Sequence, residues 1–155
     1  MAHLRGQERA KYVERMFSRI SRQYDFVNTV ITGGMHYHWR RIATQMAVSG
    51  LSGPALDVAT GTGEFVMELA RRPSTTHVVG LDFSGQMLSV AETKARRKGL
   101  HLKTTFLLGD ALDLPFPDDT FVSVTSGFSL RNIIDVPRAL REMARVTKIG
   151  GRLAI

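Results

Sequence analysis

The chain has 155 residues, 43% of them hydrophobic and 23% charged, which is the composition of a globular domain with a buried core. The lack of cysteine excludes disulfide bonds and thiolate metal sites. The sequence shows neither an apolar run of transmembrane length nor a signal-peptide pattern, so we expect a cytoplasmic protein.

The net charge of +7 is concentrated in the first third of the chain. Arginines recur there at helical spacing, namely Arg5, Arg9, Arg15, Arg19 and Arg22. Such a stripe is typical of a solvated helix face, which is the interpretation we favour. It also suits an anionic partner, such as nucleic acid or a membrane surface.

Two helices are predicted in residues 1–50. The first covers residues 7–22, where apolar side chains recur with helical spacing. The second covers residues 35–48 and is followed by Gly50, a residue typical of helix C-termini. We expect residues 1–50 to form an N-terminal helical appendage that serves as a lid.

From residue 51 onward, short apolar runs alternate with helical patterns. The runs cover residues 55–59, 77–81, 102–108, 121–126 and 152–155, and the helical patterns cover residues 64–72, 84–98 and 136–146. Strands that alternate with helices predict βαβ units and a parallel sheet. We therefore expect an α/β fold in which residues 51–155 form a Rossmann-like domain.

A turn with two glycines follows the first predicted strand, in the sequence Asp57-Val58-Ala59-Thr60-Gly61-Thr62-Gly63. Ligands of open α/β sheets bind beyond the carboxyl ends of the strands. A dinucleotide fingerprint needs a third glycine where this chain has Val66, so a pyrophosphate-containing cofactor fits poorly. An ordinary strand-to-helix turn is the alternative interpretation.

Carboxylates also follow the next two predicted strands, at Asp82 and Asp110. An acid after the second strand can accept the hydroxyls of a ribose, and one after the third can accept an adenine amino group. Each acid alone could merely cap a helix. Together, and with Asp57 suited to a cationic group, they indicate an adenosine ligand without phosphates, which describes S-adenosylmethionine.

Four segments resemble the successive motifs of class I S-adenosylmethionine-dependent methyltransferases: residues 57–63, 81–84, 109–111 and 148–151. Residues 24–39, YDFVNTVITGGMHYHW, are similar to the N-terminal signature of the ubiquinone/menaquinone biosynthesis C-methyltransferases. Residues 128–132 and 145–151 resemble further segments of that family. The chain departs from the family pattern at Val27, Thr32, Gly127, Ser129 and Ile149.

The resemblance implies C-methylation of a prenylated hydroquinone, either demethylmenaquinol or a ubiquinol precursor, with S-adenosylmethionine as methyl donor. The implied cofactor-binding residues are Asp57, Thr60, Gly61, Thr62, Gly63, Asp82, Phe83, Asp110 and Ala111. The implied catalytic residues are Arg131 and Asn132. An arginine stays protonated below a pKa of ~12, so Arg131 would orient a water or stabilise a phenolate rather than act as a base.

The acceptor ring would lie under the appendage. The implied substrate-binding residues there are Tyr24, Asp25, Asn28, His36 and Trp39. Packing against the sheet is the alternative role for Trp39. His36 and His38 have no third ligand near them in the sequence, so we expect no metal site.

The family fold further implies one more helix and two more strands after the last predicted strand. An incomplete sheet would leave an open edge that favours a homodimer. A prenylated substrate would favour peripheral contact with the inner membrane surface, and no nucleic-acid partner is expected. The alternatives are a methyltransferase for another small molecule and a non-catalytic fragment or subunit that binds S-adenosylmethionine.

Overall fold

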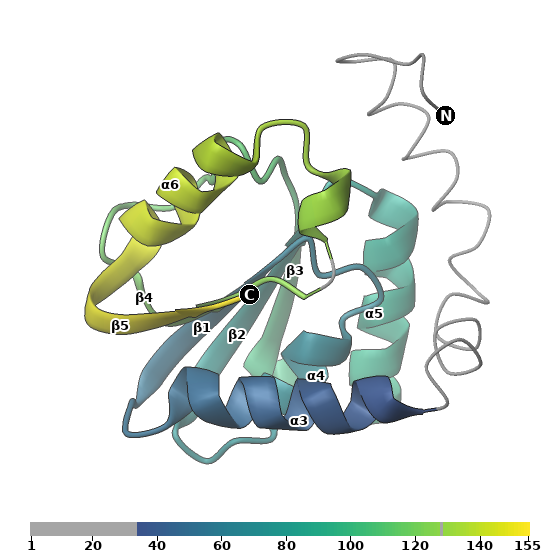
Figure 1. The fold of residues 1–155 in the computed structure, drawn as a ribbon. Helices are drawn as coiled ribbons and strands as arrows, with labels where there is room; N and C mark the ends of the chain where they lie inside the picture. Colours follow the sequence, from purple (N-terminus) through teal and green to yellow (C-terminus); the bar gives the residue numbers. More distant parts are fainter. Residues whose placement is uncertain (1–33, 128) are drawn as a thin grey trace.

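The computed structural model describes residues 34–127 and 129–155 (Figure 1). The predicted helix at residues 7–22 lies outside the described residues, as do Tyr24, Asp25 and Asn28. The predicted helix at residues 35–48 is confirmed as α3 (Met35–Val48).

Five parallel strands form one sheet in the order β3-β2-β1-β4-β5. Their bounds are β1 (Gly53–Val58), β2 (Thr75–Asp82), β3 (Thr104–Leu108), β4 (Phe121–Thr125) and β5 (Thr147–Ala154). The chain winds outward from β1 in one direction and then returns to continue from β4 in the other. This topology confirms the expected Rossmann-like α/β fold.

The bounds of all five strands differ from the predicted ranges by one or more residues, and two of these differences have a clear structural reason. Residues 102–103 belong to the short 3-10 helix η1 (His101–Lys103), because the N–H of Lys103 bonds back to the carbonyl of Leu100. Strand β5 begins at Thr147 rather than at residue 152, directly after the preceding helix. Its early part pairs irregularly with β4 and has Gly150 at φ +78°, which is the geometry of a bulge that sequence alternation does not reveal.

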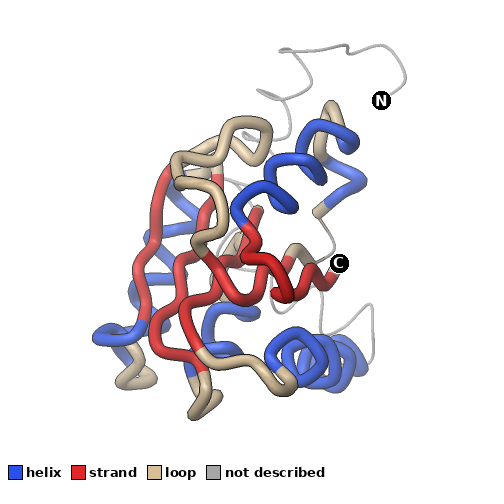
Figure 2. Tube along the Cα trace, turned by 90° about the vertical axis from the view of Figure 1, so that its left-hand side faces the viewer, coloured by secondary structure: helices blue, strands red, loops and turns tan. Residues whose placement is uncertain are grey.

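Helices cover both faces of the sheet. Along the chain, α4 (Glu64–Ala70) connects β1 to β2, α5 (Gly85–Arg97) connects β2 to β3, and α6 (Val136–Val146) connects β4 to β5. In Figures 1 and 2, β5 runs between α6 above and α3 below. The helix starts follow local chemistry, since Ser84 accepts from the N–H of Met87 and Asp135 accepts from the N–H of Arg138. Asp135 is therefore the N-cap of α6.

Each face of the sheet has its own apolar cluster. The cluster on the α6 face contains Leu56, Val58, Leu81, Leu114, Phe121, Val124, Ala139, Met143 and Val146. The cluster on the α3 and α4 face contains Val48, Ala55, Val66, Leu69, Ala70 and Val78. Alternate residues of β1 point to opposite clusters, so both faces of this central strand are buried.

Glu64 joins the three helices on the second face. It lies at the start of α4 and accepts from Arg40 Nη1 of α3 at 3.2 Å and from Lys94 Nζ of α5 at 2.7 Å. Burial opposes ionisation of Glu64, but the hydrogen bond and charge of Lys94 outweigh it and lower the pKa of the carboxyl. The ionised carboxylate therefore links α3 to the rest of the domain.

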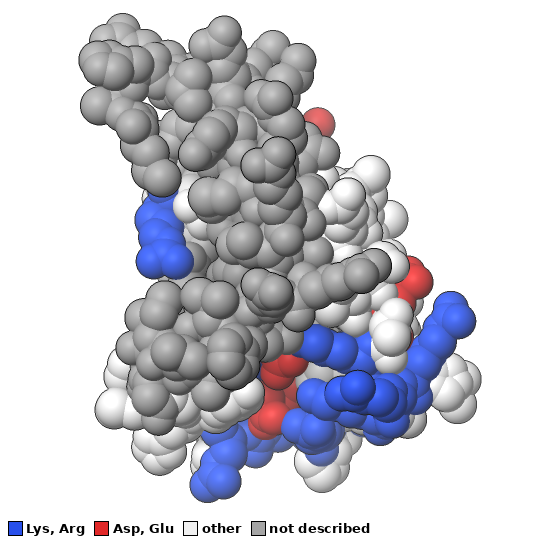
Figure 3. Space-filling model, turned by 90° about the vertical axis from the view of Figure 1, so that its right-hand side faces the viewer, with Lys and Arg blue, Asp and Glu red and all other residues white. Residues whose placement is uncertain are grey.

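None of the described helices has the length and apolar character needed to cross a bilayer. Basic side chains gather over the lower part of the face that Figure 3 shows. Three consecutive basic residues, Arg96, Arg97 and Lys98, are exposed at the end of α5.

Candidate functional site

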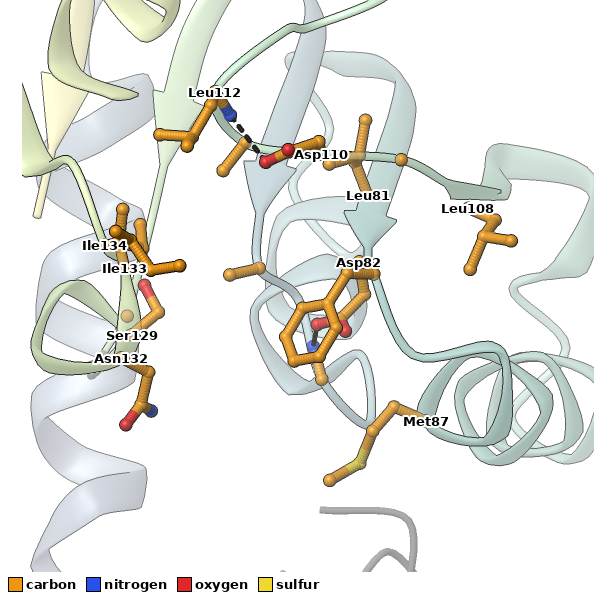
Figure 4. A pocket seen from close by; sticks show the side chains of 16 residues that line it. Leu81, Asp82, Met87, Leu108, Asp110, Leu112, Ser129, Asn132, Ile133 and Ile134 are labelled. Atoms are coloured by element: carbon orange, nitrogen blue, oxygen red, sulfur yellow. Dashed lines mark hydrogen bonds between the residues drawn. The ribbon is translucent and has the colours of Figure 1, made fainter. Parts of the chain in front are cut away.

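A cavity of about 340 Å³ opens where β1, β2, β3 and β4 end (Figure 4). Its size falls in the range of small-molecule sites. The residues that line it are Ala59, Gly61, Leu81, Asp82, Phe83, Met87, Leu108, Gly109, Asp110, Ala111, Leu112, Gly127, Ser129, Asn132, Ile133 and Ile134. The cavity therefore lies at the ligand-binding end predicted for an open α/β sheet.

Asp57 is buried beneath the glycine turn and does not line the cavity. Its two carboxyl oxygens accept hydrogen bonds of 2.6 Å from the hydroxyls of Thr60 and Thr125. Burial raises the pKa of Asp57 to about 7, although the two hydroxyl groups act in the opposite direction. Through these two hydrogen bonds, the Asp57 carboxyl links the glycine turn to β4.

The glycine turn is shaped by positive φ angles and by close packing. Gly61 has φ +57°, and its N–H donates to Asp82 Oδ2 at 2.7 Å. Gly63 has φ +78°, and a Cβ at this position would come within 2.8 Å of the Ala91 side chain on α5. Only glycine meets both conditions at residue 63 without strain.

Asp82 and Asp110 differ in how much of their hydrogen-bonding capacity is used. Asp82 is buried, and it accepts from the N–H groups of Gly61 and Ser84 with one oxygen each. Burial raises its pKa despite these backbone hydrogen bonds. Asp110 is exposed at the cavity, and only its Oδ1 accepts a hydrogen bond within the described chain, from the N–H of Leu112. Its Oδ2 can therefore accept from a ligand.

The walls of the cavity are mostly apolar. In Figure 4, Ile133 and Ile134 stand on one side and Leu81 and Leu108 on the other, while Asp110 lies above the gap between them. Such a slot suits a flat heteroaromatic ring whose edge meets a hydrogen-bond acceptor.

Six of the predicted site residues are brought together as lining residues: Gly61, Asp82, Phe83, Asp110, Ala111 and Asn132. Four more lie in or under the same turn without lining the cavity: Asp57, Thr60, Thr62 and Gly63. Arg131 is exposed on the 3-10 helix η2 (Leu130–Asn132), outside the lining. His36 and Trp39 lie on α3, and none of the described α3 residues lines the cavity.

Sequence reasoning missed most of the apolar walls. The unpredicted lining residues include Met87, Leu108, Leu112, Ile133 and Ile134. Ile133 and Ile134 directly follow the predicted Asn132 in the segment after β4, and this neighbourhood was the one available signal.

Gly127 and Ser129, two of the residues that depart from the family's sequence pattern, both fit their surroundings in the structure. A Cβ at Gly127 would come within 2.1 Å of the Phe65 ring, so glycine leaves room for that ring beside the end of β4. The buried Ser129 hydroxyl lies 2.6 Å from the Ser126 hydroxyl, and Ser126 in turn donates to the carbonyl of Val58. Both residues are therefore accommodated by their neighbours.

A sequence model of the ubiE/COQ5 methyltransferase family matches residues 5–155. The chain belongs to this family. Among the family's curated relatives, the demethylmenaquinone methyltransferase of Roseiflexus sp. (strain RS-1) is 42% identical over 95% of this chain and 60% of the relative. The enzyme of the same name from Deinococcus radiodurans is 43% identical over 96% of this chain and 61% of its own. The chain thus spans about 60% of the length of these relatives.

Solved structures agree with the fold. The YcgJ protein of Bacillus subtilis is 32% identical, with a TM-score of 0.70 over 76% of this chain and 49% of its own. A putative S-adenosyl-L-methionine-dependent methyltransferase of Methanococcus maripaludis is 22% identical, with a TM-score of 0.71 over 99% of this chain and 65% of its own. The five-stranded sheet is therefore the sheet of methyltransferase-like folds.

Proposed function

We propose that the protein transfers a methyl group from S-adenosylmethionine to a ring carbon of a prenylated hydroquinone, either demethylmenaquinol or a ubiquinol precursor. The observation that carries this proposal is the cavity with Asp82 and Asp110 at neighbouring strand ends, in a chain of the ubiE/COQ5 family. The names of the relatives support a quinone acceptor, since they include demethylmenaquinone and 2-phytyl-1,4-naphtoquinone methyltransferases.

The lining residues fit S-adenosylmethionine. Each Asp82 oxygen accepts one backbone N–H and keeps a lone pair for a ribose hydroxyl. The free Oδ2 of Asp110 suits the exocyclic amino group of adenine, and the apolar walls suit its ring. The buried Asp57 would act through the turn that its hydrogen bonds hold, since burial raises its pKa to about 7 and leaves the carboxyl only partly ionised near neutral pH.

Bound S-adenosylmethionine supplies an electrophilic methyl group on a sulfonium centre. The task left to the chain is to orient an electron-rich ring carbon in line with that methyl group. Asn132 lines the cavity and offers an amide that can hydrogen-bond a ring hydroxyl or a water. Arg131, on the same 3-10 helix, is the proposed group that orients this water or stabilises the phenolate.

Calorimetry with S-adenosylmethionine and S-adenosylhomocysteine, together with a turnover assay on a demethylquinol, tests the proposal. Asp110→Asn should weaken both ligands, because the amide has a single acceptor oxygen. If that oxygen keeps the hydrogen bond from the Leu112 N–H, an NH2 group replaces Oδ2 and meets the adenine amino group donor to donor. Asp113→Asn is the matched control, since Asp113 is an exposed acid of the same loop outside the cavity lining. Binding without turnover would favour a non-catalytic subunit, and no binding would contradict the assignment.

We also infer peripheral contact with an anionic membrane surface, because the proposed acceptor carries a prenyl tail. The exposed Leu108 and Ile134 offer apolar surface at the cavity, whereas the exposed Arg96, Arg97 and Lys98 end α5 at the opposite edge of the sheet and offer charge for contact through a second face. Cosedimentation with anionic and with neutral vesicles separates the two contributions. A charge-neutralised variant of the three basic residues that still sediments with anionic vesicles would contradict the charged contact.

A further inference from the structure

The loop between β3 and β4, residues 109–120, carries the polar end of the cavity. Asp110, Ala111 and Leu112 of this β3–β4 loop line the cavity, yet the loop contains no helix or regular strand. Within the loop, the N–H of Asp113 bonds to the carbonyl of Asp110 at 3.2 Å. An irregular segment of this length keeps one shape only when contacts from outside the loop hold it.

Arg145, in the last turn of α6, supplies such contacts. Its guanidinium forms a bidentate salt bridge with Glu142, in which Nε donates to Oε1 at 2.8 Å and Nη2 donates to Oε2 at 2.7 Å. The remaining donors reach the β3–β4 loop, where they bond to the carbonyls of Leu114 and Phe116 and to Asp118 Oδ1 at 2.8–3.0 Å. All five N–H groups of the guanidinium are thereby used.

Glu142 completes the attachment at the same point of the loop. Its Oε2 accepts from the N–H of Leu114 at 2.8 Å, so both backbone polar groups of Leu114 are held by the pair. The hydrogen bond from Arg145 lowers the pKa of Glu142 to about 2, and the carboxyl therefore stays ionised at neutral pH.

A second arginine of α6 holds the loop closer to the cavity. Arg138 Nε donates to the carbonyl of Leu112 at 2.8 Å. The carbonyls of Leu112, Leu114 and Phe116 are thus bound in succession by one helix. The Leu114 side chain is also buried in the α6-face cluster, which fixes the loop from its apolar side.

We propose that the Arg145–Glu142 pair positions the β3–β4 loop so that Asp110 faces the adenine amino group, and thereby sets the selectivity of the cavity for adenine. This inference rests on the proposed function, because it takes S-adenosylmethionine as the ligand. Arg145 and Glu142 are positioning residues that do not line the cavity. Without the pair, the loop spends only part of its time with Asp110 in place, and the apparent affinity for a ligand that needs the Asp110 hydrogen bond falls by that fraction.

A purely structural role would weaken every ligand of the cavity alike, so the test compares two ligands that differ at the adenine edge. S-adenosylhomocysteine carries the 6-amino group that Asp110 would accept, whereas S-inosylhomocysteine carries an oxygen there. The hydrogen bond to a charged acceptor predicts that the unaltered chain prefers S-adenosylhomocysteine by about 10- to 100-fold in Kd. Isothermal titration calorimetry measures both constants on the same preparation.

We expect Arg145→Met to reduce this preference to within about threefold of unity, mainly through weaker binding of S-adenosylhomocysteine. Arg145→Lys retains the charge but cannot bind three acceptors and Glu142 together, so we expect an intermediate preference. Arg141→Met is the matched control, because Arg141 is an exposed arginine of α6 whose side chain makes no hydrogen bond within the described chain. It should retain the full preference.

Far-UV circular dichroism confirms that each variant is folded, and Arg145→Lys provides the measurement should Arg145→Met fail to fold. A folded variant that weakens both ligands equally, or that keeps the full preference, would overturn the positioning role. If the unaltered chain binds neither ligand, the proposed function itself fails, which is a different result from a lost or retained preference.

Discussion

Replacing Gly63 by alanine should destabilise the domain through two separable effects. The residue has φ +78°, and an L-residue in the left-handed region costs about 1–2 kcal/mol. The new Cβ would also lie 2.8 Å from the Ala91 Cβ and 3.1 Å from Phe106 Cε1, and overpacking of this kind costs about 1–3 kcal/mol. The two effects together predict a loss of about 2–5 kcal/mol in the free energy of unfolding.

Gly99→Ala isolates the first effect. Gly99 has φ +68°, but a Cβ there would meet nothing within 4 Å, so its loss should stay near about 1–2 kcal/mol. Urea unfolding of both variants measures the difference, which should appear as a lower midpoint with an unchanged m-value. Combining Gly63→Ala with Ala91→Gly should recover part of the crowding cost in a double-mutant cycle. Equal losses for the two single variants would refute the claim that the turn is packed tightly against α5.

Three further changes test other parts of the structure. The folded-state pKa of Asp57 is raised from 3.8 to about 7, so its contribution to stability is present below about pH 4 and is lost as the pH rises through about 7. The free energy of unfolding, measured with urea, should therefore fall less for Asp57→Asn than for the unaltered chain between about pH 5 and about pH 8, and an equal fall would contradict this reasoning. Arg131→Ala should leave the Kd for S-adenosylhomocysteine unchanged and lower the methylation rate by about 100-fold or more, and near-normal turnover would remove its proposed role. Asp135→Ala should lower the free energy of unfolding by about 1 kcal/mol, because the N-cap of α6 is lost; an unchanged urea midpoint would show that this cap contributes nothing.

The order of elements in the described domain could be predicted because short apolar runs and helical patterns alternate clearly after residue 51. The start of β5 could not, since the bulge near Gly150 interrupts strand alternation and looks like a turn in the sequence. Boundaries of this kind depend on the partner strand, which a local pattern does not contain.

The predicted site shows the same division between local and distant information. Asp82 and Asp110 could be placed at the cavity because the carboxyl ends of parallel strands meet at one edge. The burial of Asp57 could not be predicted, because it depends on Thr125, which lies 68 residues further along the chain. The contacts of Arg145 with the β3–β4 loop likewise span about 30 residues and leave no local signal.

The close approach of Phe65 to Gly127 has a consequence for how relatives of this chain can diverge. The Phe65 ring occupies the space of a side chain at residue 127, and it also carries the Arg40 guanidinium 5.7 Å from its centroid. A serine or alanine at residue 127 therefore requires either that the Phe65 ring moves or that residue 65 becomes smaller. Either change would alter the contact of this ring with Arg40, whose ion pair with Glu64 would remain as one of the attachments of α3. Substitutions at residues 127 and 65 are therefore expected to be coupled in relatives of this chain.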